Sequence, residues 1–414
     1  MRTLAMVSTV LLMAGAAFAD PPNARWGRIP GFGADMTAAT GTTDGLQTWI
    51  TGFRGRAMAA GISSAVFDSA MTGLEYLPDV IKKDRNQNEF TKTIWDYLDT
   101  AVSDDRLAAG KAALVKHADL LARIESAYGV EKEVVLAIWG LESAYGAVRG
   151  DTSTIQALAT LAYDGRRAAF FEGELVAALQ ILQSGDVVPA NMTGSWAGAM
   201  GHTQFMPTSY LALAVDFTGD GKRNIWGDDP SDALASTAAY LASFGWQKGK
   251  LWGVEVALPT GFDYALAGEK IKKPATDWLA MGIRTASGAK LPDHGEGSIL
   301  LPGGARGAAF MIFGNFKVIE KYNTADAYVI AVGHLADRIK GGPAIQAVWP
   351  RQYRALSFTE RVEMQQRLLA AGFSPGGVDG KIGPLTIAAV KAFQTASGIV
   401  PDGYPSLDIL NRLR

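Results

Sequence analysis

The 414-residue chain contains no cysteine. This absence excludes disulfide bonds, thiolate nucleophiles and thiolate metal sites. It also excludes membrane attachment through an acylated cysteine, so we expect no lipid anchor.

Histidine is scarce as well, with four residues in the whole chain. They form no H-E-x-x-H motif and lie far apart, whereas zinc amidases and peptidases need clustered histidine and carboxylate ligands. Zinc chemistry is therefore disfavoured, and we expect catalysis to require no cofactor. The four residues are His117, His202, His294 and His334.

Neither sign of charge dominates, because 39 lysines and arginines face 41 aspartates and glutamates, a net charge of −2. This balance gives no electrostatic reason to bind nucleic acid and favours a neutral or mixed-charge substrate. The length allows two or three domains. A composition of 48% hydrophobic and 19% charged residues is ordinary for a soluble globular protein.

One long apolar run stands at the start of the chain, at residues 4–17. Its length of about 14 residues is short of the roughly 20 that a membrane-spanning helix needs, so a membrane anchor is the weaker alternative. Arg2 precedes the run and A-F-A follows it at residues 17–19, which is typical of a signal peptide. We expect residues 1–19 to be cleaved near Ala19 and the protein to be soluble in the periplasm.

The rest of the chain is predicted to be mainly helical. Residues 20–45 are rich in proline, glycine, alanine and threonine and are expected to form a flexible arm. Apolar residues recur at helical spacing through residues 46–146 and again through residues 316–339. Between them, short β-like runs broken by proline and glycine predict a β-rich insertion at residues 251–313.

The C-terminal end is expected to be a separate small unit. A Gly-Gly-Pro break at residues 341–343 starts a linker, residues 341–353, and residues 354–414 are predicted to form three short helices. Ser357 followed by Glu360 predicts a capping box on the first helix, and a later Gly-Pro pair opens the second. So small a core suits a binding module better than an enzyme.

Two dense motifs carry the chemistry: W-G-L-E-S-A-Y-G at residues 139–146, and G-S-W-A-G-A-M-G-H-T-Q-F-M-P-T-S-Y at residues 194–210. Val135, Ile138 and Glu142 fall at i, i+3 and i+7, so Glu142 is expected to share a helix face with apolar side chains. A carboxyl group held against apolar packing favours its neutral form and can donate a proton near neutral pH. The alternative is an ordinary solvated glutamate, and the small and polar neighbours in the motif favour the acid.

These motifs resemble those of lytic murein transglycosylases of the membrane-bound lytic transglycosylase B type. The resemblance spans about residues 46–340, and it implies a lysozyme-like helical catalytic domain over that range. Three further runs belong to it: D-R-N-Q-N-E-F-T-K-T-I-W-D-Y-L (residues 84–98), A-L-A-T-L-A-Y-D-G-R-R-A-A-F-F (157–171) and Y-N-T-A-D-A-Y-V-I-A-V-G-H-L-A-D-R-I (322–339).

The resemblance implies that peptidoglycan glycan strands are the partner and that Glu142 is the single catalytic acid and base. Glu142 would protonate the oxygen between N-acetylmuramic acid and N-acetylglucosamine, while the substrate's acetamido group steadies the charge at C1. The resulting carboxylate would then take the proton of the C6 hydroxyl, which closes on C1 as a 1,6-anhydro end. A hydrolytic muramidase and an inactive wall-binding scaffold are the alternatives.

Matching motif positions imply polar and aromatic residues that line the cleft. A tyrosine ring packs on the C–H faces of a sugar while its hydroxyl bonds a substituent. For Tyr240 a half-buried core position is an equal alternative. The residues implied are Ser195, Gln204, Tyr240, Tyr322 and Tyr328.

The segment D-F-T-G-D-G-K-R-N-I-W, residues 216–226, resembles a calcium-binding loop. The twelfth position is Gly227 instead of glutamate, and about two extra residues precede the aspartate that would close the site. An Asx-turn loop without metal is therefore the alternative to a structural calcium ion. The ligands implied are Asp216, Thr218, Asp220, the carbonyl of Lys222, and Asp232.

The terminal unit is similar to the peptidoglycan-binding domain found in many wall hydrolases. The runs L-L-A-A-G-F-S-P-G-G-V-D-G-K-I-G-P-L-T-I-A-A-V-K-A-F-Q (residues 368–394) and G-I-V-P-D-G (398–403) carry the similarity. It implies a module that holds the enzyme on an insoluble polymer and raises the local substrate concentration. A purely structural cap is the alternative, and no protein partner is predicted.

Overall fold

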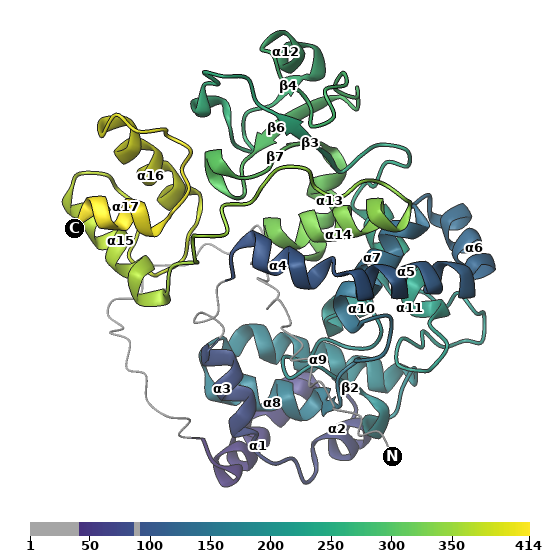
Figure 1. The fold of residues 1–414 in the computed structure, drawn as a ribbon. Helices are drawn as coiled ribbons and strands as arrows, with labels where there is room; N and C mark the ends of the chain where they lie inside the picture. The colour runs from purple at the N-terminus through teal and green to yellow at the C-terminus, as the bar shows by residue number, and fades with distance from the viewer. Residues whose placement is uncertain (1–40, 87–91) are drawn as a thin grey trace, which may run out of the picture.

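The computed structural model describes residues 41–86 and 92–414. The expected signal segment at residues 1–19 lies outside the described residues, as does most of the expected arm at residues 20–45. Within the described ranges helices dominate, joined by a small antiparallel sheet and a helical C-terminal unit (Figure 1). The predicted fold class, mainly α with a small β-containing insertion and a three-helix C-terminal domain, is confirmed.

The helices are α1 (Thr43–Ala59), α2 (Ser64–Met71), α3 (Pro78–Asn86), α4 (Ile94–Ala101), α5 (Asp104–Lys116), α6 (Ala118–Tyr128), α7 (Lys132–Ser143), α8 (Thr154–Asp164), α9 (Ala168–Ser184), α10 (Pro207–Leu213), α11 (Ser231–Ser243), α12 (Ala275–Ala280), α13 (Gly314–Tyr322), α14 (Asp326–Ile339), α15 (Phe358–Ala370), α16 (Pro384–Ala396) and α17 (Leu407–Leu413). The strands are β1 (Thr152–Ser153), β2 (Thr193–Gly194), β3 (Gly253–Ala257), β4 (Lys273–Pro274), β5 (Arg284–Thr285), β6 (Glu296–Leu300) and β7 (Ala309–Ile312).

Two hydrophobic clusters organise the helical part of the molecule. The α8–α9 cluster also takes in α1, α2, α3 and α10, in the lower half of Figure 1. The α7–α14 cluster takes in α4, α5, α6, α11 and α13, and it includes residues of the sheet. Tyr240 and Tyr322 pack against both clusters. The two halves of the helical part, each built around one cluster, therefore meet at these tyrosines.

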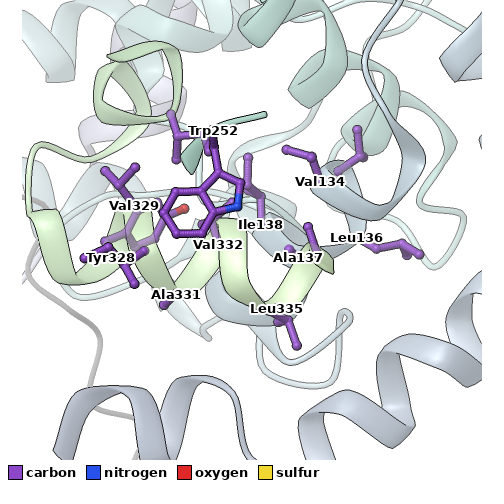
Figure 2. Packing of buried hydrophobic residues seen from close by; sticks show 14 of the residues in the cluster. Val134, Leu136, Ala137, Ile138, Trp252, Tyr328, Val329, Ala331, Val332 and Leu335 are labelled. Carbon is purple, nitrogen blue, oxygen red and sulfur yellow. The ribbon is translucent and has the colours of Figure 1, made fainter. Parts of the chain in front are cut away.

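Helices α7 and α14 pack directly on each other at the centre of the second cluster (Figure 2). Ile138 of α7 and Val332 of α14 are fully buried, and Trp252, the residue before β3, closes the cluster. Gly333 permits this closure, because a Cβ atom built there would lie 2.3 Å from the Trp252 ring. The packing holds the last turn of α7 beside the first turns of α14.

The sheet has the strand order β4-β6-β7-β3-β5, with antiparallel neighbours throughout. Its central strand β7 pairs Met311 with Val254 of β3 on one side and with Ile299 of β6 on the other. The three longer strands coincide with the β-like runs in the sequence. Strands β4 and β5 have two residues each and carry no run of their own.

The C-terminal unit begins with the predicted capping box. Ser357 Oγ accepts a hydrogen bond from the backbone N–H of Glu360 at 3.2 Å, and the Glu360 carboxylate accepts one from the N–H of Ser357 at 2.8 Å. The unit also lies directly against the sheet region. Lys391 Nζ donates to the carbonyl of Ala267 at 2.7 Å, and Asp402 accepts from the N–H of Ala305 at 2.9 Å.

Across residues 41–86 and 92–414, no helix is both long enough and apolar enough to span a membrane.

Candidate active site

Glu142 occupies the last turn of α7, beyond a run of fully buried side chains that includes Val135 and Ile138. The residue itself is half-buried. Its Oε1 accepts a hydrogen bond from the hydroxyl of Tyr328 on α14 at 2.5 Å. Burial raises the pKa of Glu142 from 4.5 to about 7, and the bond from Tyr328 opposes part of that rise because it favours the carboxylate. The group can therefore hold a proton near neutral pH and surrender it during a reaction.

Three tyrosines share the electrostatic environment of Glu142. Burial is the main cause of the high pKa of Tyr97, Tyr322 and Tyr328, and the negative charge of Glu142 adds to it in each case. All three hydroxyls therefore stay protonated and can donate hydrogen bonds. Tyr97, on α4, was not among the residues implied by the sequence motifs, although it belongs to the run W-D-Y-L at residues 95–98.

Tyr240 and Tyr322 lie face to edge, with ring centroids 4.9 Å apart. The hydroxyl of Tyr322 donates to the carbonyl of Thr203 at 2.6 Å, and that of Tyr240 donates to the carbonyl of Lys321 at 2.5 Å. Phe205 packs against both rings. Tyr240 thus makes the contacts of a half-buried core residue, which was the alternative given for it from the sequence. A role for Tyr240 or Tyr322 in substrate binding stays a prediction.

The chain turns sharply after Glu142. Ala144, Tyr145 and Gly146 have φ angles of 50°, 58° and 85°, a left-handed conformation that side chains rarely adopt. Tyr145 is held there because its hydroxyl donates to the carbonyl of Arg106 at 3.0 Å and its ring fills the space above two glycines, one on α5 and one on α7. Backbone strain of this kind persists where the surroundings over-determine it, which is common at functional sites.

The second motif forms a loop supported by pairing between β1 and β2. Ser195 is buried, and its Oγ accepts a hydrogen bond from the N–H of Ala199 at 3.1 Å. Gln204 has a φ of 56°, and its amide donates to the carbonyls of Arg149 and Gly201 at 3.0 and 2.8 Å. The remaining oxygen, Gln204 Oε1, is buried without a hydrogen-bond donor in the described part of the chain, and a role for Gln204 in substrate binding stays a prediction.

The acidic loop at residues 216–232 brings three of its predicted ligands together. Carboxylate oxygens of Asp216, Asp220 and Asp232 lie within 4.8 Å of one another. Backbone N–H groups already bond these carboxylates: Asp232 accepts from Phe217, Thr218 and Asn224 at 2.8–3.0 Å. Asp220 accepts only from the N–H of Lys222 among the bonds in the described chain, at 2.9 Å, which leaves lone pairs for a cation. This oxygen-rich set fits calcium chemistry.

A second acidic group, Glu269, Glu320 and Asp326, joins the sheet region to α13 and α14. Lys317 bonds both glutamates, at 2.9 Å in the case of Glu320. Burial, followed by the charge of Glu269, raises the pKa of Asp326 to about 7. Lys317 offsets one negative charge of this group, and its bonds to both glutamates link α13 to the sheet region.

The transglycosylase SLT domain model matches residues 45–337, and a putative peptidoglycan binding domain model matches residues 359–413. The membrane-bound lytic murein transglycosylase B of Escherichia coli K12 is 36% identical over 245 residues, which are 58% of this chain. The chain spans 65% of the length of that relative.

Solved structures agree with this match. SltB3 from Pseudomonas aeruginosa, solved with NAG-NAM-pentapeptide, is 48% identical and superposes with a TM-score of 0.87, over 89% of this chain and 99% of that one. The lytic transglycosylase SLT35 of Escherichia coli, solved in complex with calcium, is 31% identical with a TM-score of 0.61, over 72% and 93% of the two chains. The chain therefore belongs to the transglycosylase SLT domain family, with the lysozyme-like helical fold of that family and a C-terminal peptidoglycan-binding domain.

Proposed function

We propose that this protein is a lytic transglycosylase that cleaves the β-1,4 bond between N-acetylmuramic acid and N-acetylglucosamine in peptidoglycan. The observation that carries the proposal is the position of Glu142 at the end of a buried helix, where burial raises its pKa to about 7 and the hydroxyl of Tyr328 donates to its Oε1 at 2.5 Å. The relatives support it, since murein transglycosylase B and SLT35 of Escherichia coli are named as lytic transglycosylases and SltB3 was solved with NAG-NAM-pentapeptide and with NAG-anhNAM-pentapeptide.

The proposed reaction uses Glu142 twice. Its proton passes to the glycosidic oxygen, and the hydroxyl of Tyr328 stabilises the carboxylate that forms. The carboxylate then removes the proton of the C6 hydroxyl, whose oxygen closes on C1 as a 1,6-anhydro ring. Glu142 is the only carboxylate in the two motifs at residues 139–146 and 194–210. This pattern supports a single acid and base, because glycosidases that hydrolyse their substrate usually use a pair of carboxyl groups.

The remaining predicted site residues would hold the sugar and exclude water. We assign this role to the polar and aromatic residues near the two motifs, and we assign the C-terminal domain to the glycan strand itself. Peptidoglycan as substrate places the enzyme in the periplasm. The residues proposed to bind substrate are Ser195, Gln204, Tyr240, Tyr322 and Tyr328.

Product analysis separates this function from its alternatives. Purified peptidoglycan digested with the protein is expected to release muropeptides that end in 1,6-anhydro-muramic acid, each lighter by one water than the hydrolytic product. Mass spectrometry of the soluble fraction measures this difference. Reducing muramic acid ends would identify a hydrolytic muramidase instead, and a fraction with no soluble product would identify a wall-binding scaffold.

We further propose that the acidic loop binds a structural calcium ion through Asp216, Asp220, Asp232, the Thr218 hydroxyl and the Lys222 carbonyl. Calcium at about 100 times its dissociation constant should stabilise the fold by roughly 2.7 kcal/mol, visible as a higher melting temperature. Magnesium at equal concentration should have a smaller effect, because it demands a tighter octahedral site.

The matched variant for this test is Asp220→Asn, since an asparagine oxygen keeps the bond to the N–H of Lys222 and removes one charge. It is expected to retain the fold and lose the calcium-dependent shift. Equal melting curves with calcium and with chelator in the unaltered protein would show that the loop is held by its hydrogen bonds alone.

A further inference from the structure

We propose that His202 is a positioning residue that ties the end of α7, which carries Glu142, to the loop at residues 216–232. The neutral ring, with its proton on Nε2, makes this connection. The inference rests on the proposed function only in taking Glu142 as the catalytic acid.

His202 contacts the end of α7 through both its ring and its backbone. The indole N–H of Trp139 donates to His202 Nδ1 at 3.2 Å, and the hydroxyl of Ser143 donates to the carbonyl of His202 at 2.5 Å. The ring also lies against the left-handed turn after Glu142. A Cβ atom built on Gly146 would lie 2.6 Å from Nδ1, so only glycine allows this approach at the φ of 85°.

The same residue holds the loop from the other side. Its backbone N–H donates to the carbonyl of Ile225 at 3.1 Å, and Nε2 lies 2.7 Å from the carbonyl of Gly227. Arg149 reinforces this contact, because its guanidinium donates to the carbonyls of Trp226 and Gly227 at 2.9 and 2.5 Å. His202 is therefore bonded on every side, and it is only 3% exposed.

The partners determine the protonation state of the ring. An indole N–H can only donate, so Nδ1 must carry a lone pair. Nε2 faces the Gly227 carbonyl at 2.7 Å, which can only accept, and an N–H of Arg149 at 3.2 Å, which can only donate. The lone pair on Nδ1 and the shorter contact with the carbonyl assign the proton of the neutral ring to Nε2. A second proton on Nδ1 would set two donors against each other. Burial lowers the pKa of His202; Arg149 lowers it as well, whereas the Gly227 carbonyl, Asp228 and Asp229 raise it.

The connection matters because Glu142 immediately precedes Ser143. Loss of either side of the His202 contact would release the last turn of α7 and the strained turn that follows it. A displacement of about 1 Å in a catalytic group can cost roughly a hundredfold in rate. His202 itself bonds only protein groups in the described chain, so its removal should affect the chemical step more than substrate binding.

Two substitutions of His202 each remove one of the two hydrogen bonds of its ring. In His202→Asn the amide oxygen can still accept from Trp139 but the side chain no longer reaches Gly227, whereas His202→Gln can reach Gly227 but presents no acceptor to Trp139. Each is expected to lower kcat on purified peptidoglycan by roughly tenfold to a hundredfold, with KM changed by less than about twofold. The control is His117→Gln, because His117 packs against the same Trp139 ring, with centroids 5.5 Å apart, and lies near Asp229, but its side chain makes no hydrogen bond to the loop in the described chain.

The ring can also be observed directly in the unaltered protein, which keeps the proposal testable if a variant does not fold. Nitrogen-15 spectra of the histidine side chains should show His202 as the neutral tautomer with Nε2 protonated from about pH 6 to 8. A proton on Nδ1 in this range would overturn the proposal. Unchanged kcat in both folded variants would overturn it too.

Failure of the proposed function gives a different result. If the unaltered protein forms no anhydro products, or if Glu142→Gln forms them at full rate, the function itself is wrong. If anhydro products depend on Glu142 but not on His202, only the positioning role fails.

Discussion

Glu142→Gln is expected to lower the rate of peptidoglycan cleavage by roughly a hundredfold to ten-thousandfold, the usual contribution of a general acid or base. Glutamine has nearly the same shape and can still accept the hydrogen bond from Tyr328, but it has no proton of suitable acidity to transfer. The release of soluble muropeptides from purified peptidoglycan measures the rate. Lytic activity equal to that of the unaltered protein would refute the catalytic assignment.

The control substitution is Glu133→Gln, on the same helix but in its first turn, which should leave the rate unchanged. Thermal unfolding curves test whether the Glu142→Gln variant loses activity only because it is unfolded. The pKa of folded Glu142, about 7, exceeds the ordinary value of 4.5, so the folded state binds more protons between these values and loses stability as the pH rises through 7. Glutamine does not titrate, so the variant should be at least as stable as the unaltered protein at pH 8.

Tyr328→Phe is expected to shift the pH dependence of cleavage to higher pH. In the unaltered protein, kcat/KM should fall about tenfold per pH unit above roughly pH 7, because free Glu142 must be protonated to act as the acid. The Tyr328 bond favours the carboxylate, so its loss raises the pKa of Glu142 further. A hydrogen bond to a charged group contributes roughly 1.5–3 kcal/mol, which corresponds to a shift of about one to two pH units.

The same variant should also lower kcat by roughly tenfold to a hundredfold, because the carboxylate formed after proton transfer loses its donor. Tyr322→Phe is the matched comparison, since the Tyr322 hydroxyl bonds the carbonyl of Thr203 instead of Glu142. It should leave the pH midpoint in place whatever its effect on the rate. A midpoint that stays near pH 7 in Tyr328→Phe would show that this bond does not control the titration.

Patterns of adjacent residues in the sequence were sufficient to predict much of the fold. Ser357 and Glu360 predicted the start of α15, and a Gly-Pro pair predicted the start of α16 at Pro384, because caps depend on a few adjacent residues. The helical spacing also runs from Leu114 to Ile124 without interruption, yet the chain breaks at His117 between α5 and α6. Strands β4 and β5 were missed because two-residue strands are selected by their partners in the sheet.

In the candidate site, too, features set by nearby residues could be predicted from the sequence, and features set by distant contacts could not. The apolar spacing before Glu142 predicted its environment, since helix geometry alone places Val135 and Ile138 on the inward face. The left-handed turn at Ala144 and Tyr145 could not be predicted, because that conformation normally calls for glycine or asparagine. It depends on contacts of Tyr145 with Arg106 and Gly110 of α5, which lie more than thirty positions earlier in the chain. Tyr97 reaches the site for a similar reason, through the packing of α4 on α14.

Tyr240 and Tyr322 touch both hydrophobic clusters, so the two halves of the molecule are joined by the aromatic rings that are proposed to meet the sugar. Any hinge opening between the halves must first pull both rings away from Phe205 and break the bond from Tyr322 to Thr203. A mutational scan that measures only activity cannot distinguish residues that hold the two clusters together from residues that take part in catalysis at this contact.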